Sequence, residues 1–300
     1  MKYGLGIDFG GTLLRCAIID EEGNIVDQIK NPTKECKNKD DLVNKIVEMS
    51  NKLDYKKYGI TKAGVAVCGP VEPKTGVIDS LPNVPFEPFS LKEELQSNLG
   101  LEVEVGNDAN VAAFAESKIG FGKGKDIVEY VTISTGIGAG LVINGKIVEG
   151  FKGMAQEIGH MRVLDSEFEK LCSGTGIVLL CSRHGVEVEN AKEFFDKVVA
   201  KDETMLKIYD EWLEILSDQI ANMVYFIAPE AIVFGGGVMK SKDIFFDEFV
   251  RRVKAKIYPR LADSIAFKIT KLDQDITVVG AGVLGILKRH FKCLFLFSVA

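Results

Sequence analysis

A pair of polar residues, Asn107 and Asp108, lies where an alternating run gives way to an alanine-rich stretch, in EVEVGNDANVAAFAE at residues 102–116. Asn and Asp favour helix starts, where their side chains accept hydrogen bonds from free backbone amides. A carboxylate held there can also take a proton from a substrate hydroxyl as a general base. The local pattern favours capping and catalysis equally for Asp108, and the two roles are compatible because a helix start holds the side chain rigid.

Glycine-rich turns follow three apolar runs of the chain. Glycine lets backbone N–H groups approach an anion without an intervening Cβ. Each of the first two turns alone is more typical of an ordinary hairpin, but two matching turns favour a pair of phosphate nests. Neither fits a Walker A loop or a dinucleotide-binding G-x-G-x-x-G helix. The third would let adenine or ribose lie against the backbone, or is a tight strand-to-helix turn. The residues of the three turns are Gly10, Gly11 and Thr12; Thr135, Gly136 and Gly138; and Gly235, Gly236 and Gly237.

The elements that would position these turns follow a repeated plan. Residues 7–26 and 133–148 each read as an apolar strand, a turn rich in Gly and Thr, a second apolar strand and a further Gly turn. The repeat predicts two similar domains that face one another across a cleft. The two apolar strands of the first unit are predicted at 3–9 and 13–20, and those of the second unit at 129–134 and 139–143. Further strands are predicted at 63–67, 101–105, 231–236 and 276–282.

Helical periodicity separates several of these strands. One apolar face is formed by Leu42, Ile46, Met49 and Leu53, and another by Ile208, Trp212, Ile215, Gln219 and Met223. Strands and helices mixed at this spacing predict an α/β architecture.

Composition narrows the class of partner. The chain has 300 residues, 46% of them hydrophobic and 27% charged, and a net charge of −6. No block of like charge is present, so we expect neither a nucleic acid nor a membrane as partner, but a small molecule. The six cysteines are scattered without a CxxC pair, and the start MKYGLGIDFGG lacks the features of a signal peptide. We therefore expect a cytoplasmic protein.

Eight segments, in order along nearly the whole chain, give the sequence a clear family resemblance. It resembles the ROK family of sugar kinases, nearest to its bacterial glucokinases, within the actin-like ATPase superfamily. The matching segments are GIDFGGT, CGPVEPKTG, LPNVPF, GNDAN, STGIGAG, QEIGH, SGTGI and PEAIVFGGGV.

The resemblance implies a fold and an activity. The fold would be α/β, a two-domain actin-like ATPase (ribonuclease H-like) fold with an interdomain cleft. A small domain would span 1–107, joined by the C-terminal helix at about 283–300, and a larger one 108–282. The activity would be ATP- and Mg²⁺-dependent phosphorylation of a hexose at its 6-hydroxyl, with glucose as the expected hexose. The protein would be a homodimer. N-acetylglucosamine, N-acetylmannosamine, fructose or allose are alternative acceptors.

The resemblance also implies residue roles. Asp108 would be the general base, and Asp8 would lie near the nucleotide's Mg²⁺, through water. Sugar hydroxyls would be bound by Asn107, Glu157, His160 and Glu169, with Asn83 a weaker candidate because Asn in such a loop is usually turn chemistry. Without the resemblance, the default interpretation is a solvated surface acid for Glu157 and a core histidine for His160.

Two departures from the family pattern matter. The usual zinc loop, C-x-C-G-x-x-G-C, is missing from HMRVLDSEFEKLCSGTGI, so we predict that zinc is absent. Ser134 replaces a Gly in the second phosphate motif. A non-catalytic, sugar-responsive regulator is the alternative class, but ROK-like repressors carry an N-terminal helix-turn-helix, and only six residues precede Ile7 here.

Overall fold

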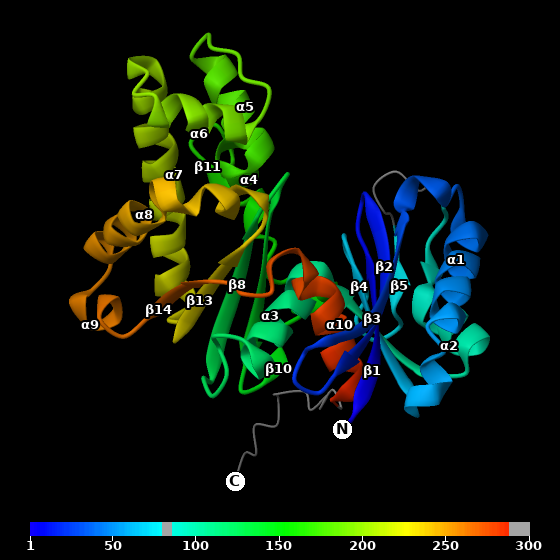
Figure 1. The fold of residues 1–300 in the computed structure, drawn as a ribbon. Coiled ribbons are helices and arrows are strands. Elements are labelled where there is room, and N and C mark those ends of the chain that lie inside the picture. The colour runs from blue at the N-terminus through cyan, green and yellow to red at the C-terminus, as the bar shows by residue number, and fades with distance from the viewer. Residues whose placement is uncertain (80–85, 288–300) are drawn as a thin grey trace.

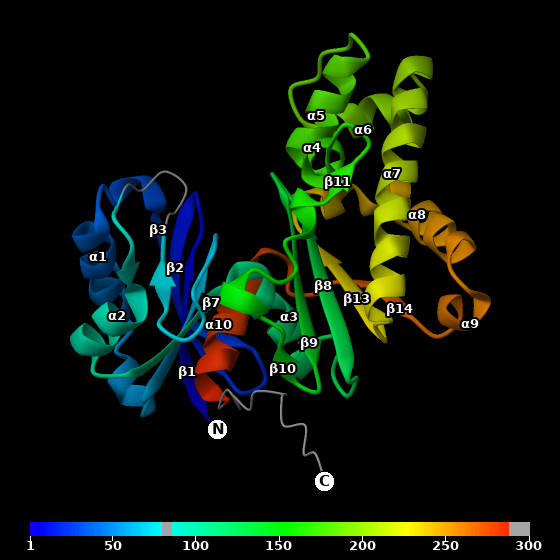
Figure 2. The ribbon, with the colours of Figure 1, turned by 180° about the vertical axis from the view of Figure 1, so that it is seen from behind.

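The computed structural model describes residues 1–79 and 86–287. Two lobes, each built on a five-stranded sheet, lie side by side with helices between and outside them (Figure 1). The same arrangement is seen from behind in Figure 2.

The N-terminal sheet has the strand order β3-β2-β1-β4-β7. Its first three strands form an antiparallel meander, and β4 and β7 run parallel to β1. Helices α1 and α2 cover its outer face (Figure 1). The elements are β1 (Tyr3–Phe9), β2 (Leu13–Asp20), β3 (Ile25–Pro32), α1 (Lys39–Lys52), β4 (Lys62–Val67), β5 (Val77–Ile78), β6 (Phe89–Ser90), α2 (Leu91–Leu99) and β7 (Glu102–Asn107).

The second sheet repeats this order as β10-β9-β8-β13-β14. Again three antiparallel strands are followed by two parallel ones, so the predicted duplication is confirmed. The elements of this lobe, including the separate hairpin of β11 and β12, are β8 (Ile127–Ile133), β9 (Ile137–Ile143), β10 (Lys146–Ile147), β11 (Arg162–Val163), β12 (Ser166–Glu167), α4 (Phe168–Cys172), α5 (Gly174–Arg183), α6 (Ala191–Val199), α7 (Glu203–Ile227), β13 (Ala231–Gly235), α8 (Lys242–Lys256), α9 (Pro259–Ala262) and β14 (Ala266–Ile269).

Two helices each pack on a different sheet from the one that they follow in the sequence. Helix α3 (Asp108–Ile119) follows the last strand of the first sheet but packs on the second, where a Cβ at Gly140 would collide with Ala109. Helix α10 (Ile276–Ile286) follows the last strand of the second sheet but packs on the first, where a Cβ at Gly6 would collide with Val278. Both lie between the two sheets (Figure 1).

The predicted strand at 276–282 is wrong, because this segment is the first part of α10. A short apolar run with flanking glycines does not distinguish a strand from a helix buried on all sides. Here every residue from Val278 to Gly285 is buried, and glycines of the helix and of the facing strands allow the backbones to approach closely. The other predicted strands are confirmed to within two residues at each end.

The helical periodicity is confirmed as well. The predicted face at 42–53 is buried along α1, and the face at 208–223 is buried along α7, including its polar member Gln219. Among the residues described, none belongs to a helix that is long and apolar enough to cross a bilayer.

The exchange of helices gives a physical basis for a domain division. We propose that the boundary lies between β7 and α3, at residues 107–108, because α3 packs on the second sheet. The N-terminal domain then gains α10, which begins at Ile276 rather than at about 283. Residues 288–300 of the predicted C-terminal helix lie outside the described residues. The chain crosses between the domains a second time in the segment from β14 to α10, and we call each of these two crossings a passage.

Candidate active site

Five of the sequence-predicted site residues line a cavity between the two lobes: Asp8, Gly10, Asp108, Gly236 and Gly237. Its volume is about 260 Å³, and it is bounded by the end of β1, the start of α3, strand β8, the turn after β13 and the start of α10. The lining residues are Asp8, Gly10, Arg15, Asp108, Tyr130, Thr132, Ser134, Gly236, Gly237, Lys240, Asp273, Gln274, Ile276 and Thr277.

Of the two roles considered for this pair, helix capping and proton transfer, the capping role belongs to Asn107. Asn107 is the N-cap of α3, where its Oδ1 accepts from the backbone N–H groups of Ala109 at 3.0 Å and Asn110 at 3.3 Å. Its Nδ2 donates to Gly69 O at 3.3 Å. Both acceptor positions of the amide oxygen are thus used, so only one N–H of Asn107 remains for a sugar hydroxyl.

Asp108 is the first residue of α3 and is partly buried in the cavity wall. Its Oδ1 accepts from the backbone N–H of Ala109 at 2.8 Å, which fixes the side chain. Burial, reinforced by the negative charges of Asp8 and Glu157, raises the pKa of Asp108 to about 7. A carboxyl group with a pKa near neutrality is well suited to accept a proton from a hydroxyl.

Asp8 stands at the end of β1 and is only 4% exposed. Arg15, on the neighbouring strand, donates from Nε to Asp8 Oδ2 at 2.7 Å. Burial raises the pKa of Asp8, and the Arg15 charge and hydrogen bond oppose that rise. The ion pair therefore helps to keep a buried carboxylate charged beside Asp108.

The first glycine turn closes by a hydrogen bond of 3.0 Å from Gly10 N–H to Leu13 O. Gly11 and Thr12 form its tip, and Thr12 is exposed. The hydroxyl of Thr33 donates to Gly10 O at 2.8 Å, which holds the turn from behind.

The second turn joins β8 to β9. Ser134 N–H donates to Gly136 O at 2.8 Å, and Gly174 N–H donates to Ser134 O at 2.7 Å. Ser134 thus preserves the turn through its backbone although it replaces a Gly of the family motif. Gly138 lies behind the turn, where its added Cβ would only touch Thr132 and Ala109.

The third turn follows β13. Gly236 has φ 94°, and a Cβ there would collide with the backbone of Ile133, so the position requires glycine. Gly237 faces the cavity, whereas Gly235 is buried and packs against the ring of Tyr130.

A larger cavity of about 840 Å³ continues from the first and shares Ser134, Gly237 and Lys240 with it. Its walls combine the apolar side chains of Val178, Val238 and Ile244 with polar groups at the start of α6. This volume lies in the range of sites for ligands of nucleotide size.

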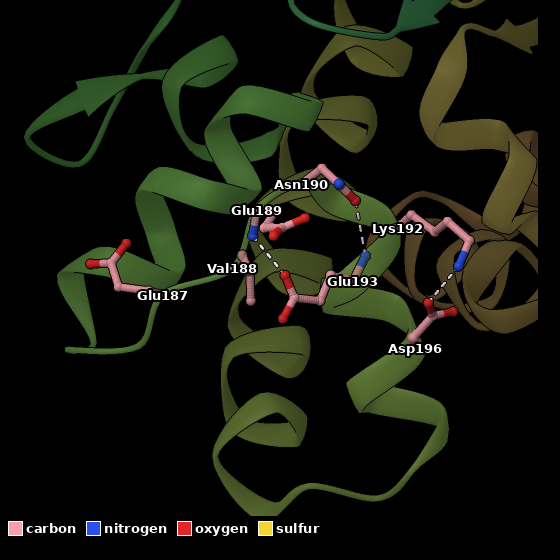
Figure 3. Close-up of a pocket in the computed structure, with 7 residues that line it drawn as sticks. All are labelled: Glu187, Val188, Glu189, Asn190, Lys192, Glu193 and Asp196. Carbon is pink, nitrogen blue, oxygen red and sulfur yellow. Dashed lines mark hydrogen bonds and ion pairs between the residues drawn. The ribbon is translucent and has the colours of Figure 1, made fainter.

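The start of α6 separates this cavity from a third, outer pocket of about 610 Å³. Figure 3 shows Asn190 capping α6 by accepting from Glu193 N–H at 3.1 Å, and Lys192 paired with Asp196 at 2.6 Å. Glu189, Asn190, Lys192 and Asp196 line both pockets, so this end of the larger cavity carries two carboxylates and one ammonium group.

Three predicted sugar residues lie on neighbouring segments beside the second turn. Glu157 is partly buried and contributes to the raised pKa of Asp108. Glu169, on α4, accepts from Ile137 N–H at 2.8 Å. His160 has a side chain 67% exposed, with Nδ1 3.8 Å from Glu167, so it is neither a core histidine nor enclosed. Asn83 lies outside the described residues.

The segment that replaces the family's zinc loop is a short hairpin. Strands β11 and β12 pair through Arg162–Glu167 and Val163–Ser166, and α4 follows directly. Within residues 1–79 and 86–287, no group of three or more His, Cys, Asp or Glu side chains is placed to hold a metal ion.

Sequence reasoning missed several residues of the cavity wall, among them Arg15, Lys240 and Thr277. Arg15 offered a signal, since it is the one charged residue between the ends of an apolar strand. Thr277 offered none, because its segment was predicted to be a strand.

The repeated sheets, the exchanged helices and the interlobe cavity define a two-domain actin-like ATPase fold. Residues 4–287 match the model described as the ROK family, and the chain belongs to that family. A glucokinase of Halalkalibacterium halodurans is 33% identical over 94% of each chain.

Solved structures agree on the fold. A ROK hexokinase from Thermus thermophilus has a TM-score of 0.80 and 23% identity, covering 94% of this chain and 97% of its own. A ROK family glucokinase from Streptomyces griseus, in complex with glucose and AMPPNP, has a TM-score of 0.71 and 24% identity, covering 93% and 97%. Other relatives include a xylose repressor of Bacillus subtilis and an inorganic polyphosphate/ATP-glucomannokinase from Arthrobacter sp. strain KM.

Proposed function

We propose that this ROK family protein is a hexokinase that transfers the terminal phosphoryl group of ATP to the 6-hydroxyl of a hexose, with glucose preferred. The observation that carries the proposal is that Asp108 lines one cavity together with Asp8, with glycines of the first and third turns, and with Ser134 of the second turn. The preference for glucose is supported by the glucokinase of H. halodurans, which is related to this chain over almost its whole length.

In the proposed reaction, Asp108 orients the 6-hydroxyl and accepts its proton. The sugar oxygen then forms a bond to the terminal phosphorus as the bond from phosphorus to the leaving diphosphate oxygen breaks. Phosphoryl transfer depends mainly on positioning and charge stabilisation, with one carboxylate orienting the acceptor. Glu157, Glu169 and His160 would bind the remaining hydroxyls, since they lie on segments that adjoin the second turn.

The residues present fit a magnesium–nucleotide complex. The N–H groups of Gly10 and Ser134 are used within their turns, so Thr12 and Thr135 at the tips would supply the donors to phosphate oxygens. Asp8 supplies one carboxylate close by. Mg²⁺ usually keeps several waters and takes few protein carboxylates, so a single acid near the phosphates suits it. When bound, Mg²⁺ would neutralise phosphate charge.

The donor we propose is a nucleoside triphosphate rather than inorganic polyphosphate. The cavity of about 840 Å³ has an apolar wall for a base and places Lys240 at the end nearest the turns. At its outer end lie Glu189 and the ion pair of Lys192 with Asp196, which together offer no net positive charge to a continuing polyphosphate chain. Polyphosphate supporting less than a hundredth of the rate with ATP would agree with this assignment.

A panel of hexoses incubated with ATP and Mg²⁺ tests the function directly. ADP release would be followed with a coupled assay, and the phosphorylated carbon identified by NMR spectroscopy of the product. We expect glucose 6-phosphate at the highest kcat/KM. Sugar binding by calorimetry without ADP release for any sugar would indicate the regulator class instead. We further propose a cytoplasmic homodimer, on the family resemblance alone.

A further inference from the structure

Arg15 makes an unusually complete set of contacts for a residue that the proposed reaction does not use. Its Nε bonds Asp8, and one terminal nitrogen donates to the carbonyl of Gln274 and lies 3.2 Å from Asp275 Oδ1. The other terminal nitrogen donates to Thr277 Oγ1 at 2.8 Å. The side chain is 13% exposed, so its donors are used within the protein.

The partners of Arg15 beyond Asp8 lie where one of the two passages between the lobes ends. Gln274 and Asp275 belong to the passage, and Thr277 to the first turn of α10. Residues 270–275 connect β14 of the second sheet to α10, which packs on the first. At the far end of this passage, Thr270 Oγ1 donates to the buried Glu116 of α3 at 2.6 Å. Arg15 therefore holds the passage to the first sheet, and Glu116 holds it to the second lobe.

The passage contains a backbone conformation that is unfavourable for its residue. Asp273 has φ 44°, in the left-handed region that non-glycine residues seldom adopt. Asp273 and Gln274 also line the cavity with Asp8 and Asp108. A movement of the lobes about this passage would thus alter the cavity wall itself.

We propose that Arg15 is a positioning residue that fixes the Asp8 carboxylate for the magnesium–nucleotide complex and ties it to residues 274–277, where the passage from β14 enters α10. This inference rests on the proposed function. Lobe closure in such enzymes assembles the reacting groups around bound ligands. Because Arg15 contacts both Asp8 and this segment, the two should stay in the same position relative to one another when the lobes move.

The planar guanidinium is required by this arrangement. Arginine presents five N–H donors in a fixed fork, and here they serve acceptors in several directions. A lysine retains the charge but reaches fewer of these acceptors with its single ammonium group. Arg15→Lys therefore separates the geometry of the contacts from their charge.

The test is calorimetric binding of Mg²⁺–AMPPNP and, separately, of glucose to the full chain. For Arg15→Lys we expect nucleotide affinity to fall at least about tenfold, glucose affinity to change less than about twofold, and kcat to fall about tenfold or more. Thr277→Val, which removes one contact, should show the same pattern more weakly. Circular dichroism melting would establish that each variant is folded.

Lys30 provides the matched control. It lies 3.8 Å from the same Asp275 carboxylate and is 50% exposed, but no contact joins it to Asp8 among those described. Lys30→Met should leave nucleotide affinity unchanged. If Arg15→Lys does not fold, Thr277→Val decides the matter.

Nucleotide affinity within about twofold of wild type in both variants would overturn the inference, as would an equal loss of nucleotide and glucose binding. These binding measurements need no turnover. A wild-type protein that binds Mg²⁺–AMPPNP but phosphorylates no hexose would therefore remove the proposed function and still test Arg15. A wild type that binds no nucleotide would overturn both.

Discussion

Glu169 Oε2 accepts a hydrogen bond of 2.8 Å from the backbone N–H of Ile137, the residue that follows the second glycine turn. The same carboxylate fills the space beside Gly136, where a Cβ would collide with it, and Gly159 lies against it from the Glu157–His160 segment. A residue assigned to the sugar side thus also supports the turn assigned to phosphate. Glu169 therefore belongs to both the sugar side and the phosphate side of the proposed site.

Substitution of Glu169 should consequently affect both substrates. Glu169→Ala removes the acceptor for Ile137 N–H, so we expect KM to rise about tenfold for glucose and for ATP. Glu169→Gln keeps an oxygen that can accept this bond, so the KM for ATP should stay within about threefold of wild type while that for glucose rises. Steady-state kinetics with each substrate varied in turn would measure this. Unchanged KM values in Glu169→Ala would contradict the shared role.

Asp108→Asn should lower kcat at least about a hundredfold, because an amide cannot accept the sugar's proton. Glucose binding, measured by calorimetry, should largely persist. The Asn side chain can still accept from Ala109 N–H, so α3 keeps its start. Asn107→Ala is the comparison: loss of the cap should cost about 1 kcal/mol of stability with a smaller effect on kcat. An Asp108→Asn enzyme with a tenth or more of wild-type kcat would remove Asp108 from the mechanism.

The pH profile should report the same carboxylate. Because the ionised form is the base and the pKa of Asp108 is raised to about 7, kcat/KM should rise with pH up to about 7 and level off above it. Glu157 contributes to that rise in pKa, so Glu157→Gln should shift the acidic limb to lower pH. A profile flat from pH 5 to 9 in the wild type, or a limb shifted upward in Glu157→Gln, would refute this assignment.

Much of the fold could be predicted from the sequence pattern, because the duplicated strands and the glycine turns are local features. The buried helix α10 did not, since its apolar sequence lacks a polar face and its helical state depends on close packing against the first sheet. Likewise, Asp108 could be singled out as a polar residue at a helix start, but its raised pKa arises from burial and from the charges of Asp8 and Glu157, which are distant in sequence. The contacts of Arg15 with Gln274, Asp275 and Thr277 join opposite ends of the chain and leave no local signal.

The hairpin of β11 and β12 bears on the prediction that zinc is absent. It closes the segment after His160 by backbone pairing, and His160 lies near Glu167. We expect chelator-washed protein to keep its activity and to contain well under one zinc per chain by elemental analysis. One tightly bound zinc per chain, with activity lost on its removal, would refute the prediction.

A buried acid that does not line the cavity should make stability depend on pH. Glu129, on β8, is 0% exposed, and neither carboxylate oxygen has a hydrogen-bond partner within the described part of the chain. Burial raises its pKa from 4.5 to about 8. The folded state therefore holds the proton more tightly than the unfolded state, and this contribution to stability is complete below pH 4.5 and lost as the pH rises through about 8.

Glu129→Gln, which keeps the shape without the ionisation, should be the more stable protein above pH 8 by a few kcal/mol, with the difference shrinking as the pH is lowered toward 5. Glu129→Leu should gain further stability at every pH, because an apolar side chain removes the unpaired polar atoms. Urea unfolding from pH 5 to 9 would measure these differences, and Glu102→Gln on an exposed strand position is the control. Parallel stability curves for wild type and Glu129→Gln would show that Glu129 does not titrate in this range, and the raised pKa would then be wrong.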